Sequence, residues 1–180
     1  MAELSAVEFA ELLRTFEHTA FRLELQPAYR EEDESDAVPR FLAGTPDPPT
    51  ESPGLRAWFA QVAEQTRQGK RIARVRVHED PPTDYQRWER WIDPWNLEAG
   101  EAIRYLTRQR AHEIGLLPAA GDQDWWLLDS RRLIVMRFDD IGNRVHDELV
   151  TDPAIVVQAC AWRDLAVHHG ALRETRGVLA

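Results

Sequence analysis

Arginine side chains recur in two short segments that have the composition of β-strands. In RIARVRV, residues 71–77, Arg74 and Arg76 fall on one face and the aliphatic residues between them fall on the other. Arg104 lies in the middle of AIRYL, residues 102–106. Because a guanidinium group binds a carboxylate or a phosphate through two parallel hydrogen bonds, these arginines could line a cleft for an anion.

Other polar residues could complete such a cleft. The candidate ligand-binding residues are Arg74, Arg76, Tyr85, Arg104, Asp129 and Arg132. An arginine within a sheet must be paired, extended toward water or exposed, and Asp129 and Glu89 are possible partners for these side chains. The alternative is therefore a set of salt bridges without a ligand.

Familiar catalytic motifs are absent from the sequence. It has no GxxxxGK[ST], GxGxxG, HExxH or GxSxG, so we expect no cofactor and assign no catalytic residue. Asp139, Asp140 and His146 could bind a metal, but a tight turn explains the aspartates better, and we expect no metal site. The single cysteine, Cys160, indicates a buried thiol and excludes an intramolecular disulfide.

The acidic residues are concentrated in the first third of the chain. The net charge is −9, and residues 1–54 carry 12 acidic and 4 basic side chains, a difference of −8. This field disfavours direct nucleic-acid binding and favours a basic partner. The candidate partner-binding residues are Glu31, Glu32, Asp33, Glu34 and Asp36. A solvated loop is the alternative for this acidic and proline-rich connection, residues 30–54.

The stretch DWWLLDSRRLIVMRFDDIGN, residues 124–143, predicts a hairpin with Asp129, Ser130, Arg131 and Arg132 at its tip. Trp125 and Trp126 are adjacent on a strand, so they must face opposite ways. One ring would enter the core, and the other would need a second layer of helices or a partner. Packing explains most of the seven tryptophans better than base stacking does.

Hydrophobic periodicity predicts the order of the helices and strands. Helices and strands alternate along the first part of the chain, and three consecutive antiparallel strands, a meander, follow. Strands are expected in 20–26, 70–78, 101–106, 124–129, 132–139 and 144–150, and helices in 5–16, 53–69, 83–99, 107–115 and 152–170, with one helical turn near 38–43. We expect Pro94 to end or kink its helix. The pattern predicts an α/β or α+β fold, in which helices pack on a mixed sheet with an antiparallel C-terminal meander, in a single domain over residues 1–180.

Several segments together resemble an uncharacterised family of actinobacterial proteins of about this length. The resemblance covers residues 6–169 and rests on FEHTAFRLELQPAY, RFLAG, GKRIARVRV, TDYQRWE, AGEAIRYL, the hairpin above and CAWRDLAVHH. Such proteins are often encoded beside small helix-turn-helix regulators. The resemblance implies no catalytic residues, and its polar motifs match Arg74, Arg76, Tyr85, Glu101, Arg104, Asp129 and Arg132.

Two functional hypotheses follow. The first is a non-enzymatic regulatory partner that binds a helix-turn-helix regulator through the acidic segment and modulates transcription. The second is a sensor of a small carboxylate or phosphate, or a cryptic enzyme, that uses the arginine cleft. The N-terminus lacks the features of a signal peptide and no apolar run could cross a membrane, so we expect a cytoplasmic protein, which could form homo-oligomers.

Overall fold

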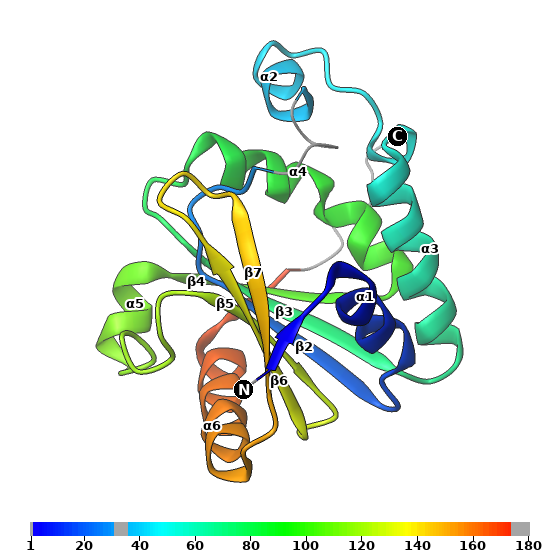
Figure 1. Ribbon diagram of the computed structural model, residues 1–180. Helices are drawn as coiled ribbons and strands as arrows, with labels where there is room; N and C mark the ends of the chain where they lie inside the picture. Colours follow the sequence, from blue (N-terminus) through cyan, green and yellow to red (C-terminus); the bar gives the residue numbers. More distant parts are fainter. Residues whose placement is uncertain (1, 31–35, 174–180) are drawn as a thin grey trace.

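An eight-stranded mixed sheet lies between two groups of helices in the computed structural model (Figure 1), which describes residues 2–30 and 36–173. The strands follow the order β1-β7-β6-β5-β2-β3-β4-β8 across the sheet. Strands β2, β3 and β4 are parallel, and every other neighbouring pair is antiparallel. The predicted class, a mixed sheet that carries helices and an antiparallel meander, is confirmed.

The strands are β1 (Ala2–Leu4), β2 (Thr19–Glu24), β3 (Arg71–His78), β4 (Ala102–Thr107), β5 (Asp124–Leu128), β6 (Arg132–Phe138), β7 (Arg144–Val150) and β8 (Ala171–Leu172). The helices are α1 (Ala6–Thr15), α2 (Ala37–Leu42), the 3₁₀ helix η2 (Pro49–Glu51), α3 (Pro53–Arg67), α4 (Asp84–Ala99), α5 (Arg108–Glu113) and α6 (Pro153–His169). Within the described ranges, no helix is both long and apolar enough to cross a membrane.

Each face of the sheet has its own apolar core. Helices α1, α3 and α4 cover one face, and α5 and α6 cover the other (Figure 1). Trp125 belongs to the core under α6 and Trp126 to the core under α1 and α3, and each ring is 2% exposed. The second cover that the adjacent tryptophans require is therefore a second layer of helices.

Three local features differ from the sequence expectations. Helix α4 continues through Pro94, because the buried side chains Trp88, Ile92 and Asn96 hold the helix against the sheet on both sides of the proline. The two short edge strands β1 and β8 were not expected, since three and two residues are too few to show a periodicity. The 30–54 connection contains η2 in addition to the expected turn at α2.

Asp129 has a structural role at the β5–β6 turn. Its carboxylate accepts hydrogen bonds from the backbone amides of Glu17, His18 and Thr19 at 2.9, 2.7 and 3.0 Å. Burial alone would raise the pKa of this carboxyl, but the three amide donors outweigh it and lower the pKa. Asp129 also has a φ of 53°, in the left-handed region, which aspartate tolerates better than most residues. It therefore joins the turn to the segment that enters β2.

The substitution Asp129→Ala should lower the free energy of unfolding by about 2–3 kcal/mol, because it leaves three amides without this acceptor and places an alanine in the left-handed region. Urea denaturation measures the change. The exposed aspartate Asp140, in the turn between β6 and β7, is the control, and Asp140→Ala should stay within about 0.5 kcal/mol of the wild type. A loss below about 0.5 kcal/mol for Asp129→Ala would contradict this role.

Candidate functional site

The register of β2 and β3 brings four charged side chains together on the α3–α4 face. Arg22 of β2 pairs with Arg74 of β3, and Glu24 pairs with Arg76. Directly paired residues of neighbouring strands point to the same face. These four residues, Arg22, Glu24, Arg74 and Arg76, lie side by side in the middle of the sheet, and we call them the charged square.

Glu24 is the common acceptor of this cluster. Its carboxylate binds Arg76 Nε at 2.7 Å, Arg74 Nη1 at 2.9 Å and Arg22 Nη1 at 3.2 Å. Glu24 is only 4% exposed, and burial alone would raise the pKa of its carboxyl. The charges of the three arginines outweigh burial and hold that pKa well below its usual range, so Glu24 is ionised at every ordinary pH.

Further carboxylates hold the outer edges of the arginines. Arg74 Nε donates to Glu101 at 2.5 Å, Arg76 Nη1 to Asp93 at 2.8 Å, and Arg22 Nη2 to Asp124 at 2.9 Å. Two tyrosine hydroxyls extend the network, since Tyr105 donates to Asp93 at 2.7 Å and Tyr29 donates to Asp124 at 2.7 Å. These buried acceptors fix the rotamers of the arginines.

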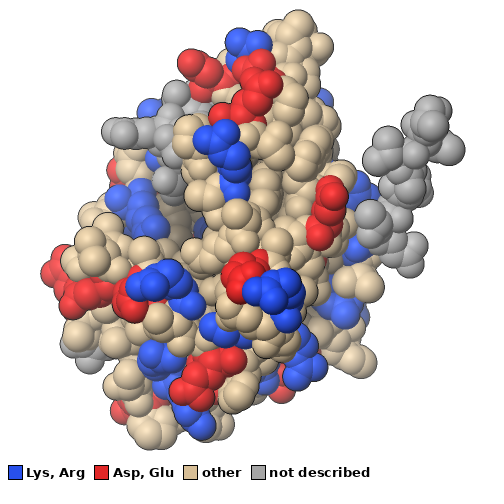
Figure 2. Space-filling model, turned by 90° about the vertical axis from the view of Figure 1, so that its right-hand side faces the viewer, with Lys and Arg blue, Asp and Glu red and all other residues tan. Residues whose placement is uncertain are grey.

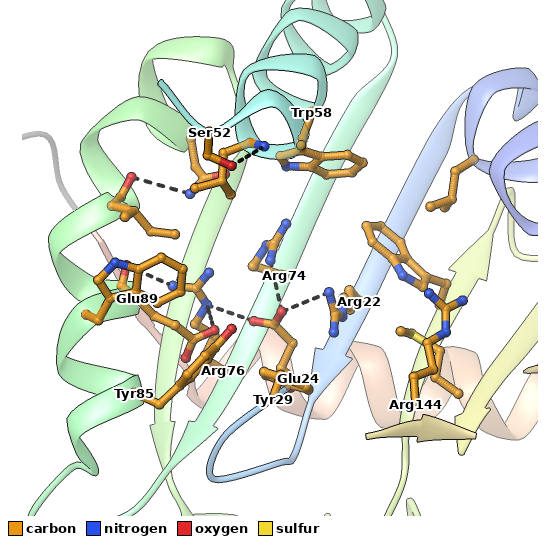
Figure 3. Close-up of a pocket in the computed structure, with 18 of the residues that line it drawn as sticks. Arg22, Glu24, Tyr29, Ser52, Trp58, Arg74, Arg76, Tyr85, Glu89 and Arg144 are labelled. Carbon is orange, nitrogen blue, oxygen red and sulfur yellow. Dashed lines mark hydrogen bonds and ion pairs between the residues drawn. The ribbon is translucent and has the colours of Figure 1, made fainter. Parts of the chain in front are cut away.

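A cavity of about 700 Å³ lies above the charged square, between the sheet and helices α1, α3 and α4 (Figure 3). Its volume falls in the range of sites for small molecules. Aromatic side chains form much of the wall. The lining includes Phe9, Arg22, Glu24, Tyr29, Ser52, Gly54, Trp58, Arg74, Arg76, Tyr85, Trp88, Glu89, Trp126 and Arg144.

The cavity surface and the layer behind it differ in charge. Four arginines line the cavity, at positions 22, 74, 76 and 144, whereas Glu24 and Glu89 are its acidic lining residues. The other carboxylates that bind these arginines, those of Asp93, Glu101, Asp124 and Asp147, do not line it. Among the described residues, no acceptor hydrogen-bonds to Arg74 Nη2. Most of the carboxylates that hold the arginines therefore lie behind the cavity wall, and Arg74 keeps one terminal nitrogen that binds no acceptor among the described residues.

Glu89 on α4 is the second acidic residue of this wall, and its pKa is shifted in the opposite direction to that of Glu24. Burial raises the pKa of its carboxyl to about 8, although Arg76 Nε lies 3.5 Å away and opposes the shift. The other charges that act on Glu89 are Glu24, which raises its pKa further, and Arg74 and Arg22, which lower it. The cavity wall therefore has one carboxylate whose charge the arginines strongly favour, Glu24, and a second, Glu89, whose charge burial disfavours.

The structure brings together only part of the predicted site. Arg74, Arg76 and Tyr85 line the cavity. Arg104 does not, because it pairs with Val75 on the opposite face, where its Nη1 donates to the Gly170 carbonyl at 3.2 Å. Asp129 and Arg132 also lie elsewhere, at the β5–β6 turn, and their side chains face each other at 3.4 Å. The structure thus does not bring Arg104, Asp129 and Arg132 to the cavity that Arg74, Arg76 and Tyr85 line.

The structure describes only one of the five acidic residues proposed to bind a partner. Glu31, Glu32, Asp33 and Glu34 lie outside the described residues. Asp36 precedes α2 and lines a second cavity of about 270 Å³ between α2, η2 and α4. The turn at Asp139 is confirmed, since its carboxylate accepts the backbone amides of Ile141 and Asn143 at 3.1 and 2.9 Å.

Most of the cavity lining was absent from the sequence prediction, including Arg22, Glu24, Trp58 and Arg144. The alternation FRLEL, residues 21–25, contains a signal for two of them. Its apolar positions form one face, so Arg22 and Glu24 must share the other, in the same way as Arg74 and Arg76 do in β3. Trp58 resembles any apolar residue of a helix stripe, and no local signal places Arg144 near the cavity.

Comparison with known protein families gives one match. A family described as a domain of unknown function, DUF6879, matches residues 7–174. The chain belongs to this family. No curated protein matches the sequence. The DUF6879 match covers every element from α1 to β8, and with it the whole lining of the cavity.

The substitution Glu89→Gln should flatten the pH dependence of stability between about pH 4.5 and 8. The folded protein holds a proton on Glu89 that the unfolded chain releases near its ordinary pKa of 4.5, so stability is full below pH 4.5 and declines as pH rises through 8. Glutamine removes this contribution. We expect the difference in unfolding free energy between wild type and variant to change by more than about 1 kcal/mol from pH 5 to 8.

Urea denaturation at pH 5, 6, 7 and 8 measures this difference. Burial also raises the pKa of Asp93 and Asp124, so part of the slope should remain in the variant. Exposed Glu113 is the control, because its pKa is lowered by hydrogen bonds from Gln109 and Arg110 and Glu113→Gln should not flatten the slope. If the unfolding free energies of wild type and Glu89→Gln depend on pH in the same way, the raised pKa of Glu89 is contradicted.

Proposed function

We propose that this protein binds a small anionic molecule in the cavity above β2 and β3. One observation carries the proposal. Guanidinium edges of fixed arginines line a cavity of about 700 Å³, while most of the carboxylates that neutralise them lie behind the wall. A carboxylate or phosphate in the cavity would meet donors that are already oriented.

The energetics favour such a ligand. Arg74 and Arg76 are 7% and 4% exposed, so water has little access to compete for their free edges. Their rotamers are held by Glu24, Glu101 and Asp93, so little side-chain entropy remains to be lost on binding. The aromatic wall adds apolar contact area around the anion.

The cavity changes the order of the two sequence hypotheses. Anion binding was the second, and the described geometry favours it. Partnership with a helix-turn-helix regulator, a regulatory role, an actinobacterial source and a cytoplasmic location stay predictions that rest on charge, composition and resemblance. Acidic and basic side chains are interspersed on the face shown in Figure 2, so that face does not single out a basic surface for nucleic acid.

Titration with inorganic phosphate and with acetate at low ionic strength tests the proposal. Trp58, Trp88 and Trp126 line the cavity, so binding should change the intrinsic tryptophan fluorescence. It should also raise the melting temperature, by an amount that grows with the logarithm of the ligand concentration above Kd. The substitution Arg74→Lys should weaken binding about tenfold, because lysine keeps the charge and loses the planar pair of donors.

Arg71 provides a matched control on the same strand. Its side chain is exposed at the start of β3, so Arg71→Lys should bind like the wild type. If Arg74→Lys does not fold, Arg144→Lys at the cavity wall replaces it. Equal affinity of wild type, Arg74→Lys and Arg144→Lys, or no response to either anion, would overturn the proposal.

A further inference from the structure

The first turn of α3 opens at the same cavity as the arginines. Ser52, its N-cap, and Gly54 both line the cavity, and the Ser52 side chain accepts the Leu55 amide at 3.4 Å. Pro53, the first residue of α3, has no N–H and Ser52 caps the Leu55 amide, so Gly54 provides the amide of this turn that has no acceptor among the described residues. The helix dipole places positive charge at this end. Helix α3 is 15 residues long, so enough peptide dipoles are aligned to give this terminus its full partial positive charge.

Arg74 adds a second and independent donor set to the same space. It is 7% exposed, its Nη2 has no acceptor among the described residues, and its guanidinium carbon lies 5.8 Å from the ring centre of Trp58 on α3. In Figure 3 its side chain lies between Glu24 and the wall that carries Ser52 and Trp58. Donors thus approach from the helix end and from the sheet.

Donors on two sides select among anions. A carboxylate directs its lone pairs within one plane, whereas a phosphate has oxygens in several directions and can accept from a helix amide and a guanidinium together. Glu89 lines the same wall, and burial raises the pKa of its carboxyl, which reduces its repulsion of an anion. The arrangement therefore suits a phosphate group better than a carboxylate.

The remaining wall is aromatic on both sides of the charged floor. The rings of Trp58 and Trp126 meet edge-to-face, with 5.9 Å between their centres. On the other side of the charged square, the ring centre of Tyr85 lies 5.5 Å from that of Tyr29 and 5.2 Å from that of Trp88. Figure 3 labels Trp58, Tyr29 and Tyr85. Trp58 and Tyr85 are half-buried. Aromatic side chains in this position bind flat rings by stacking. Inorganic phosphate alone would leave this surface unused.

We propose that the ligand is a small phosphate ester with a flat heteroaromatic ring, of the class of the nucleoside monophosphates. The phosphate lies between the α3 N-terminus and Arg74, and the ring lies against Trp58. This inference rests on the proposed anion binding and adds the chemical class. The cavity of about 700 Å³ accommodates a molecule of this size.

Calorimetric titration of the full chain with AMP, GMP, CMP and UMP tests the class, beside inorganic phosphate, benzoate, adenosine and a trinucleotide. At least one monophosphate should bind about tenfold or more tightly than phosphate, benzoate and adenosine. If phosphate and the monophosphates bind equally well, the ligand does not need an aromatic ring. If benzoate binds more tightly than the monophosphates, the ligand does not need a phosphate group. Either result would contradict the proposed ligand class and leave the proposed anion binding in place. Tighter binding of the trinucleotide than of any monophosphate would contradict a small-molecule ligand. If none of the anions binds, the proposed function itself is wrong.

The substitution Trp58→Leu separates the two parts of the ligand. Loss of stacking should weaken the best monophosphate about tenfold or more and leave inorganic phosphate within about twofold. Trp162→Leu on α6 is the control, because Trp162 packs against the other core and should not change either affinity. A monophosphate affinity unchanged by Trp58→Leu would overturn the placement of the ring.

Discussion

The ion pairs around Glu24 are the interaction on which the rest of the structure depends. Three arginines and one carboxylate occupy the middle of a sheet under two helices, where isolated charges are very costly. The cluster is tolerable only when every member is in place. This requires the in-register pairing of β2 with β3, the position of α4 that supplies Asp93 and Glu89, and Glu101 at the start of the next strand region.

A buried charge cluster is weak evidence for stability, since apolar residues of similar volume often stabilise a core as well or better. The opposite face of the same strands shows that this chain can build such a core, with Leu23, Val75 and Val77 at 0–2% exposure. Polar groups on only one face of these strands are therefore a cost that the proposed anion site would account for. The cavity above them, lined by fixed guanidinium edges, gives that cost a physical purpose.

The sequence predicted the elements better than it predicted the site. Helix α3, strand β3 and the meander follow from periodicity, because each depends on local burial of one face. The placement of Arg104 failed for a long-range reason. Alternation shows that alternate residues share a face, but not which alternate set of β4 faces Arg74, and a shift of one residue reverses it. The observed register pairs Arg104 with Val75 and Ile103 with Arg74.

The same limit explains the omission of Arg22 and Arg144. Their contribution depends on β2 lying between β3 and β5, and on β7 lying two strands beyond β5, which no segment encodes by itself. Asp129 shows the reverse case. As a polar residue beside arginines it resembles a site residue, yet its carboxylate is fully used by three backbone amides. The proposed site therefore depends on which donors have no acceptor within the folded chain, which residue type alone does not show.

A crystal structure of the protein grown with tungstate tests this account most directly, because tungstate is a tetrahedral oxyanion that anomalous scattering locates without ambiguity. The account predicts one tungstate in the cavity, with oxygens within hydrogen-bond distance of Arg74 and of the first turn of α3. Tungstate bound only to surface arginines, with the cavity free of it, would contradict the claim that this charged wall is a binding site.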